Sequence, residues 1–88
     1  TAGEYFPQPW AGGSRMDDLL GEAAWLIRRD QLVGRLAPFA GDLSRWFSGR
    51  DGEAVLVRPD RYVFGVGEPE ALAAAWAART GTTAALAA

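Results

Sequence analysis

The chain has 88 residues, 49% of them hydrophobic, and it carries a formal net charge of −2 with no cysteine and no histidine. Its length suits one small domain, and the absence of thiols excludes disulfides, thiolate metal sites and Cys-x-x-Cys redox chemistry. Because histidine is absent and every basic residue is an arginine, the usual general base and a lysine nucleophile are also missing.

The charge balance bears on the possible partners. A nucleic-acid-binding domain would show a basic patch, whereas the arginines here stand mostly beside acids, as in SRMDD, RRD and RPDR. No apolar run approaches the roughly 20 residues that cross a bilayer, and no signal peptide is visible. We therefore expect a cytoplasmic protein that binds neither nucleic acid nor membrane. Since it begins at Thr1 rather than at a methionine, we expect a processed chain or a piece of a longer one.

Residues 1–22 predict an extended arm that ends in a short turn at Asp17–Gly21. Two prolines favour an extended path, along which Tyr5, Phe6 and Trp10 would be displayed. One interpretation is a plain linker, and the other is an arm whose aromatic rings dock on a neighbouring surface. The two adjacent aspartates of the turn have no third ligand nearby, so a loop or helix-start role is favoured over a metal site.

The next two segments predict a strand followed by helix. The continuous apolar run of residues 23–28 suits a buried strand. In residues 30–49 the apolar positions recur at steps of three and four, which marks one face of a helix. A proline and a glycine interrupt this pattern, so we expect two short helices, capped by Asp30 and by Asp42 and ending at Gly49.

An antiparallel hairpin is the clearest prediction. Residues 54–58 and 62–66 are rich in β-branched and aromatic side chains, as strands are. Between them, Pro59 and Asp60 suit the two central positions of a tight turn.

A helix is expected to begin at Pro69 and to end before Gly81, with acids at its start to complement the helix dipole. Leu72, Ala75, Trp76 and Arg79 would lie along one stripe of this helix, with Trp76 as its anchor. The Ala-rich tail, residues 81–88, is expected to be a frayed helix or disordered.

The order strand, helix, strand, strand, helix predicts a small α/β domain over residues 23–80. It is the βαββα arrangement of half a thioredoxin-like fold, possibly abbreviated and without Cys-x-x-Cys.

No residue is assigned a catalytic, cofactor-binding or metal-binding role. The arginine and aspartate side chains of the hairpin turn could bind a carboxylate or phosphate, but in a tight turn structural or interface roles are favoured. The segment GVGEPE lacks the third glycine of a dinucleotide-binding turn, and its glutamates would repel a pyrophosphate. The candidates for structural or interface roles are Trp10, Arg58, Pro59, Asp60, Arg61, Tyr62 and Trp76.

Several motifs together resemble a known family. GEYFPQPW, RMDDLLG, VLVRPDRYVFG and the terminal helix with its alanines and tryptophan are similar to the C-terminal segment of class A flavoprotein aromatic hydroxylases. The branch that they resemble most is that of 3-(3-hydroxyphenyl)propionate hydroxylase. The resemblance covers residues 3–78, and residues 30–49 are shorter than the corresponding part of the family.

The resemblance implies that the parent enzyme uses FAD, NAD(P)H and O2 to hydroxylate a phenolic acid. The cofactors would be held by an N-terminal FAD and substrate domain outside these residues. This segment would be its accessory thioredoxin-like domain, inactive by itself, with a structural or oligomerising role and a possible homodimer. The alternative is a free-standing acidic interaction module that belongs to no enzyme.

Overall fold

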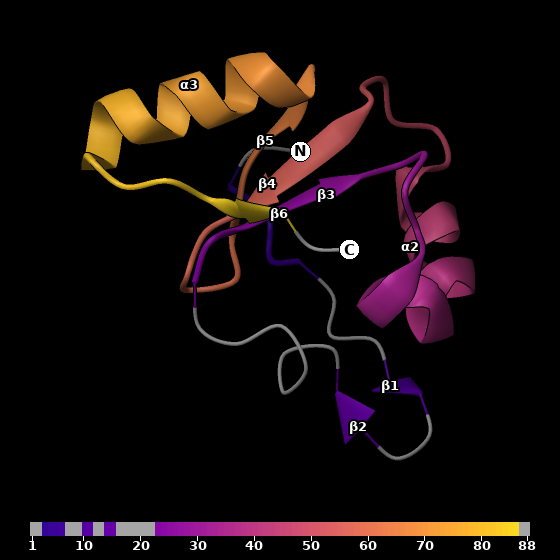
Figure 1. Ribbon diagram of the computed structural model, residues 1–88. Helices are drawn as coiled ribbons and strands as arrows, with labels where there is room; N and C mark the ends of the chain where they lie inside the picture. The colour runs from indigo at the N-terminus through magenta and orange to yellow at the C-terminus, as the bar shows by residue number, and fades with distance from the viewer. Residues whose placement is uncertain (1–2, 7–9, 12–13, 16–22, 87–88) are drawn as a thin grey trace.

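A four-stranded sheet forms the centre of the computed structural model, which describes residues 3–6, 10–11, 14–15 and 23–86. In spatial order the strands are β5 (Val63–Gly67), β4 (Ala54–Val57), β3 (Trp25–Arg28) and β6 (Ala85–Leu86). Helix α3 (Pro69–Thr80) packs on one face of the sheet, and the 3-10 helix η1 (Gly34–Phe39) packs with α2 (Ala40–Phe47) on the other (Figure 1).

Strand β4 lies between β3 and β5 and is antiparallel to both. All four of its residues are fully buried. A strand that is covered on both faces has no polar side to present, which explains why AVLV is continuously apolar. The expected hairpin is therefore confirmed. The whole is a small α/β fold, compatible with the expected abbreviated thioredoxin-like fold.

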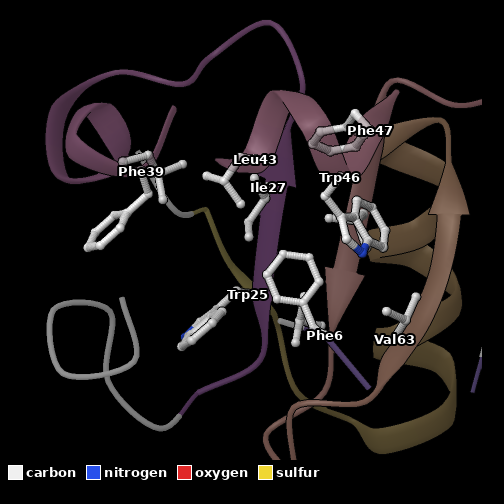
Figure 2. Packing of buried hydrophobic residues seen from close by; sticks show 11 residues of the cluster. Phe6, Trp25, Ile27, Phe39, Leu43, Trp46, Phe47 and Val63 are labelled. Carbon is white, nitrogen blue, oxygen red and sulfur yellow. The ribbon is translucent and has the colours of Figure 1, made fainter. Parts of the chain in front are cut away.

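Two hydrophobic clusters lie on the two faces of this sheet. The larger one, on the side of η1 and α2 (Figure 2), consists of Phe6, Trp25, Ile27, Leu36, Phe39, Leu43, Trp46, Phe47, Val55, Val57 and Val63. The smaller one, on the side of α3, joins Ala24, Leu56 and Trp76 to the partly buried Leu26, Phe64, Leu72 and Ala84. Because alternate residues of β4 contribute to each cluster, the sheet is sandwiched between the helical layers.

Two helical segments occur where they are expected, but the expected caps are wrong. The residues at the N-cap positions are Val33 for η1 and Phe39 for α2, and neither side chain makes a capping hydrogen bond. The two helical segments are continuous, since the N–H of Ala40 donates to a carbonyl of η1. No free helix start therefore remains for Asp42, which lies in the first turn of α2 and pairs with Arg45.

Asp30, the other expected cap, lies before η1 in the turn that follows β3. Its carboxylate pairs with Arg28, with 3.3 Å between Nε and Oδ1. Asp30 thus pairs with a residue at the end of β3 and does not cap η1.

The ends of α3 agree with the prediction. Pro69 occupies the first turn, and the carboxylate of Glu68 accepts hydrogen bonds from the N–H groups of Glu70 (3.2 Å) and Ala71 (3.0 Å). Gly81 closes the helix with φ of 73°, a left-handed conformation that glycine adopts without steric cost.

The expectation of a frayed or disordered tail is wrong at Ala85 and Leu86, which form β6. This strand pairs in parallel with β3, and the N–H of Ala85 donates to the carbonyl of Ala24 at 2.9 Å. Alanine favours helix intrinsically, but pairing with a sheet edge overrides such a weak preference.

The arm forms a short antiparallel pair, β1 (Trp10–Ala11) with β2 (Ser14–Arg15). The expected turn at Asp17–Gly21 lies outside the described residues. Within the described part of the chain, no helix is long and apolar enough to cross a membrane.

Candidate interaction surface

The hairpin turn between β4 and β5 carries five of the seven candidate residues. The carbonyl of Arg58 accepts a hydrogen bond from the N–H of Arg61 at 2.8 Å, which closes a four-residue turn around Pro59 and Asp60. Arg61 then adopts φ of 69°, and the N–H of Arg58 donates to the carbonyl of Tyr62 at 2.9 Å. A tight turn followed by one left-handed residue is a common three-residue hairpin loop.

Arg61 faces the interior of the protein rather than solvent. It is 7% exposed, and its guanidinium carbon lies 3.7 Å from the centroid of the Trp25 ring. Its Nη1 donates to the carbonyls of Ala23 (3.0 Å) and Arg58 (3.2 Å). The side chain thereby fastens the turn to the residues that lead into β3.

Arg58 and Asp60 remain on the outer side of the turn. Their side chains are 46% and 48% exposed and form an ion pair at 2.6 Å. The other carboxylate oxygen of Asp60 accepts from the N–H of Tyr62 at 3.2 Å, a local contact typical of aspartate in turns. The charged cluster expected from the sequence is therefore divided, because Arg61 faces inward while the other two side chains pair outside.

The N-terminal arm docks on this hairpin. The N–H of Gly3 donates to the carbonyl of Val63 (2.9 Å), and the N–H of Val63 donates to the carbonyl of Glu4 (2.8 Å). Tyr5 stands directly opposite Tyr62, and their rings pack edge to face with centroids 5.4 Å apart. Of the two interpretations of the arm, docking describes residues 3–6, and the surface on which they dock is the chain's own.

Phe6 fixes the arm to the core. It is 1% exposed and packs edge to face against Trp46, with the two ring centroids 5.1 Å apart (Figure 2). Glu4 forms an ion pair with Arg50 at 2.8 Å. Trp10 lies in β1, and its side chain falls outside the described part of the chain.

Beside the hairpin, an open groove of about 490 Å3 separates β5 from the C-terminal half of α3. The rings of Phe64 and Trp76 form its apolar part, edge to face with centroids 5.2 Å apart. Its lining residues are Arg58, Val63, Phe64, Trp76, Arg79 and Thr80.

A β-bulge shapes this groove. Val57 of β4 pairs with Val63, whereas the preceding Leu56 pairs with Gly65, so Phe64 is an extra residue in β5. Bulges redirect side chains at functional sites, and here Phe64 joins the cluster beneath α3. Gly65 follows it, and a Cβ there would lie 3.1 Å from Leu72 Cδ2, so the helix packs closely over the bulge.

The groove brings together two of the candidate residues, Arg58 and Trp76, which lie far apart in the sequence. Phe64 and Thr80 were not predicted, and Arg79 was predicted only as part of the helix stripe. The sequence signal that could have indicated the groove is the predicted helix stripe, which places Arg79 near Trp76 on α3. The bulge that turns Phe64 toward the groove leaves no recognisable pattern in the sequence.

The start of α3 does not fit a dinucleotide. The N–H groups of Glu70 and Ala71 at this helix start donate to the carboxylate of Glu68, and this carboxylate would repel a phosphate. Within the described residues there is also no group of three or more carboxylates that could hold a metal ion.

A comparison with models of protein families gives a match. The model of the HcaD C-terminal domain matches residues 28–82, which is more than half of the chain and runs from the last residue of β3 to just beyond the end of α3. This match confirms the expected resemblance to the C-terminal domain of aromatic hydroxylase-like proteins. No curated protein and no solved structure matches the chain.

Proposed function

Because the chain belongs to the HcaD C-terminal domain family, we propose that it is the accessory C-terminal domain of an FAD-dependent aromatic monooxygenase. Family membership indicates an accessory domain of an oxidoreductase-type enzyme. The proposal adds the reaction, in which the parent enzyme hydroxylates a phenolic acid, such as 3-(3-hydroxyphenyl)propionate, with NAD(P)H and O2.

The family match over residues 28–82 carries this proposal. The contacts of the charged residues in the hairpin VLVRPDRYVFG, a motif that resembles the aromatic hydroxylase family, also support it. Arg61 fastens the turn to the lead-in of β3, and Asp60 holds the turn closed. These are structural tasks, as expected of an accessory domain.

The proposal assigns FAD and NAD(P)H to the part of the parent that precedes this domain. When bound there, the flavin would supply the oxygen chemistry. The residues of this domain would stabilise the parent or its dimer.

The purified parent tests the proposal. It should contain about one FAD per chain by its visible absorbance, and it should consume NAD(P)H and O2 when 3-(3-hydroxyphenyl)propionate is added. A parent shortened by these 88 residues should keep its flavin and unfold at a lower temperature. A parent without flavin would refute the monooxygenase assignment. Stoichiometric flavin binding by these 88 residues alone would refute the accessory role.

A further inference from the structure

Two exposed tyrosines lie next to a residue that lines the groove, because the N–H of Arg58 donates to the carbonyl of Tyr62 and the Tyr62 ring packs against Tyr5. Tyr5 and Tyr62 are 56% and 43% exposed, although both are large and largely apolar. Their neighbours Phe6 and Val63 point into the cluster beneath α2. Because successive side chains of extended backbone alternate between faces, the two tyrosines lie on the α3 side, as Phe64 does.

We call this region the arginine–aromatic surface; it consists of Tyr5, Arg58, Tyr62, Phe64, Trp76 and Arg79. Tyrosine, tryptophan and arginine are the residue types that protein interfaces concentrate at their energetic centres. The two tyrosines do not line the groove, so they add exposed aromatic side chains beside it. A protein segment is thus a better match than a small ligand.

The charge of the surface indicates the chemistry of that segment. Among the described residues, the guanidinium of Arg79 makes no hydrogen bond or ion pair, and α3 leaves it exposed at the groove. Arg58 is opposed by one carboxylate, that of Asp60. Two guanidiniums and one carboxylate leave an excess of positive charge on a chain whose net charge is −2. A carboxylate on the partner would complement it.

A second copy of this chain fits less well. In a two-fold dimer the same surface faces itself, which would bring the two positive grooves toward each other. We infer that the arginine–aromatic surface docks a segment of the parent polypeptide that carries a carboxylate next to an aromatic or aliphatic side chain. This inference rests on the proposed function, because it takes the chain as one domain of a larger enzyme.

Photo-cross-linking in the full-length parent tests the inference. The photo-reactive residue p-benzoylphenylalanine replaces Arg79 in one variant. In a control variant it replaces Arg45, whose side chain is 76% exposed on α2, across the sheet. We expect a cross-link from position 79 to an acidic segment outside residues 1–88 of the same polypeptide, and none to that segment from position 45.

A charge test separates docking from mere proximity. With p-benzoylphenylalanine in place of Tyr62, Arg79→Glu should lower the yield of that cross-link roughly tenfold, because an attraction becomes a repulsion. Arg79→Lys keeps the positive charge and should restore most of the yield, and Arg45→Glu should leave it unchanged.

Three outcomes would overturn the inference: a cross-link between two copies, cross-links confined to residues 1–88, or a yield indifferent to the charge at position 79. Flavin content measured on the same samples keeps the two proposals apart. Flavin without the cross-link would refute only the docking surface, whereas the cross-link without flavin would refute only the monooxygenase assignment.

Discussion

Arg61 combines an unfavourable backbone with a favourable side chain. Its φ of 69° costs a non-glycine residue on the order of 1–2 kcal/mol, and most hairpin loops place glycine or asparagine at such a position. The side chain offsets this cost, since its guanidinium stacks on Trp25 and donates to two backbone carbonyls. The backbone of residue 61 therefore lowers the free energy of unfolding and its side chain raises it, and mutations can separate the two effects.

Substituting Arg61 by alanine and by glycine separates these effects. Arg61→Ala removes the stacking and the hydrogen bonds but keeps the strained backbone, so we expect a loss of about 2–4 kcal/mol in the free energy of unfolding. Arg61→Gly removes the same contacts but relieves the strain, so its loss should be smaller by about 1 kcal/mol. Urea unfolding followed by circular dichroism measures both, and equal losses would show that the backbone is not strained.

At the scale of elements, local patterns predicted most of the fold. The hairpin, its proline turn and α3 with its glycine cap follow from spacing and turn chemistry, which act over a few residues. The two short helical segments also follow from their apolar spacing. Their caps did not follow, because η1 continues directly into α2 and leaves no free helix start for an aspartate.

The elements that the sequence did not reveal depend on contacts between distant residues. Strand β6 exists because β3 has a free edge, and the arm docks because β5 has one. Neither fact can be read from AALAA or from GEYF alone. The same limit applies to the groove, since the bulge at Phe64 arises from the register of β5 against β4. Arg58 and Trp76 were predicted as candidates, but their proximity was not.

The docked arm gives a testable prediction for a whole element. Phe6→Ala should lower the free energy of unfolding by about 3–5 kcal/mol, since it removes a fully buried ring from the larger cluster. Tyr5→Ala is the matched control, because the neighbouring ring is mostly exposed and should cost about 1 kcal/mol or less. Thermal and urea unfolding measure both. Similar, small losses for the two variants would contradict docking of the arm in solution.

At the scale of the whole molecule, β4 joins the two layers. Val55 and Val57 contribute to the cluster beneath α2, and Leu56 between them contributes to the cluster beneath α3. Neither helical layer can lose its packing without exposing one face of the same buried strand. A domain of this size is expected to unfold in one cooperative step, and the shared strand is the physical reason here.

Two truncations, one on each face, test this coupling. Leu43→Ala leaves a cavity at a fully buried position of α2 and should cost about 2–5 kcal/mol. Leu72→Ala affects a partly buried position of α3 and should cost less, about 1–3 kcal/mol. In both variants the indole N–H signals of Trp46 and Trp76, which report on opposite faces, should vanish at the same urea concentration. If the Trp76 signal were lost first in Leu72→Ala, α3 would be a separate unit resting on a sheet that stays folded without it.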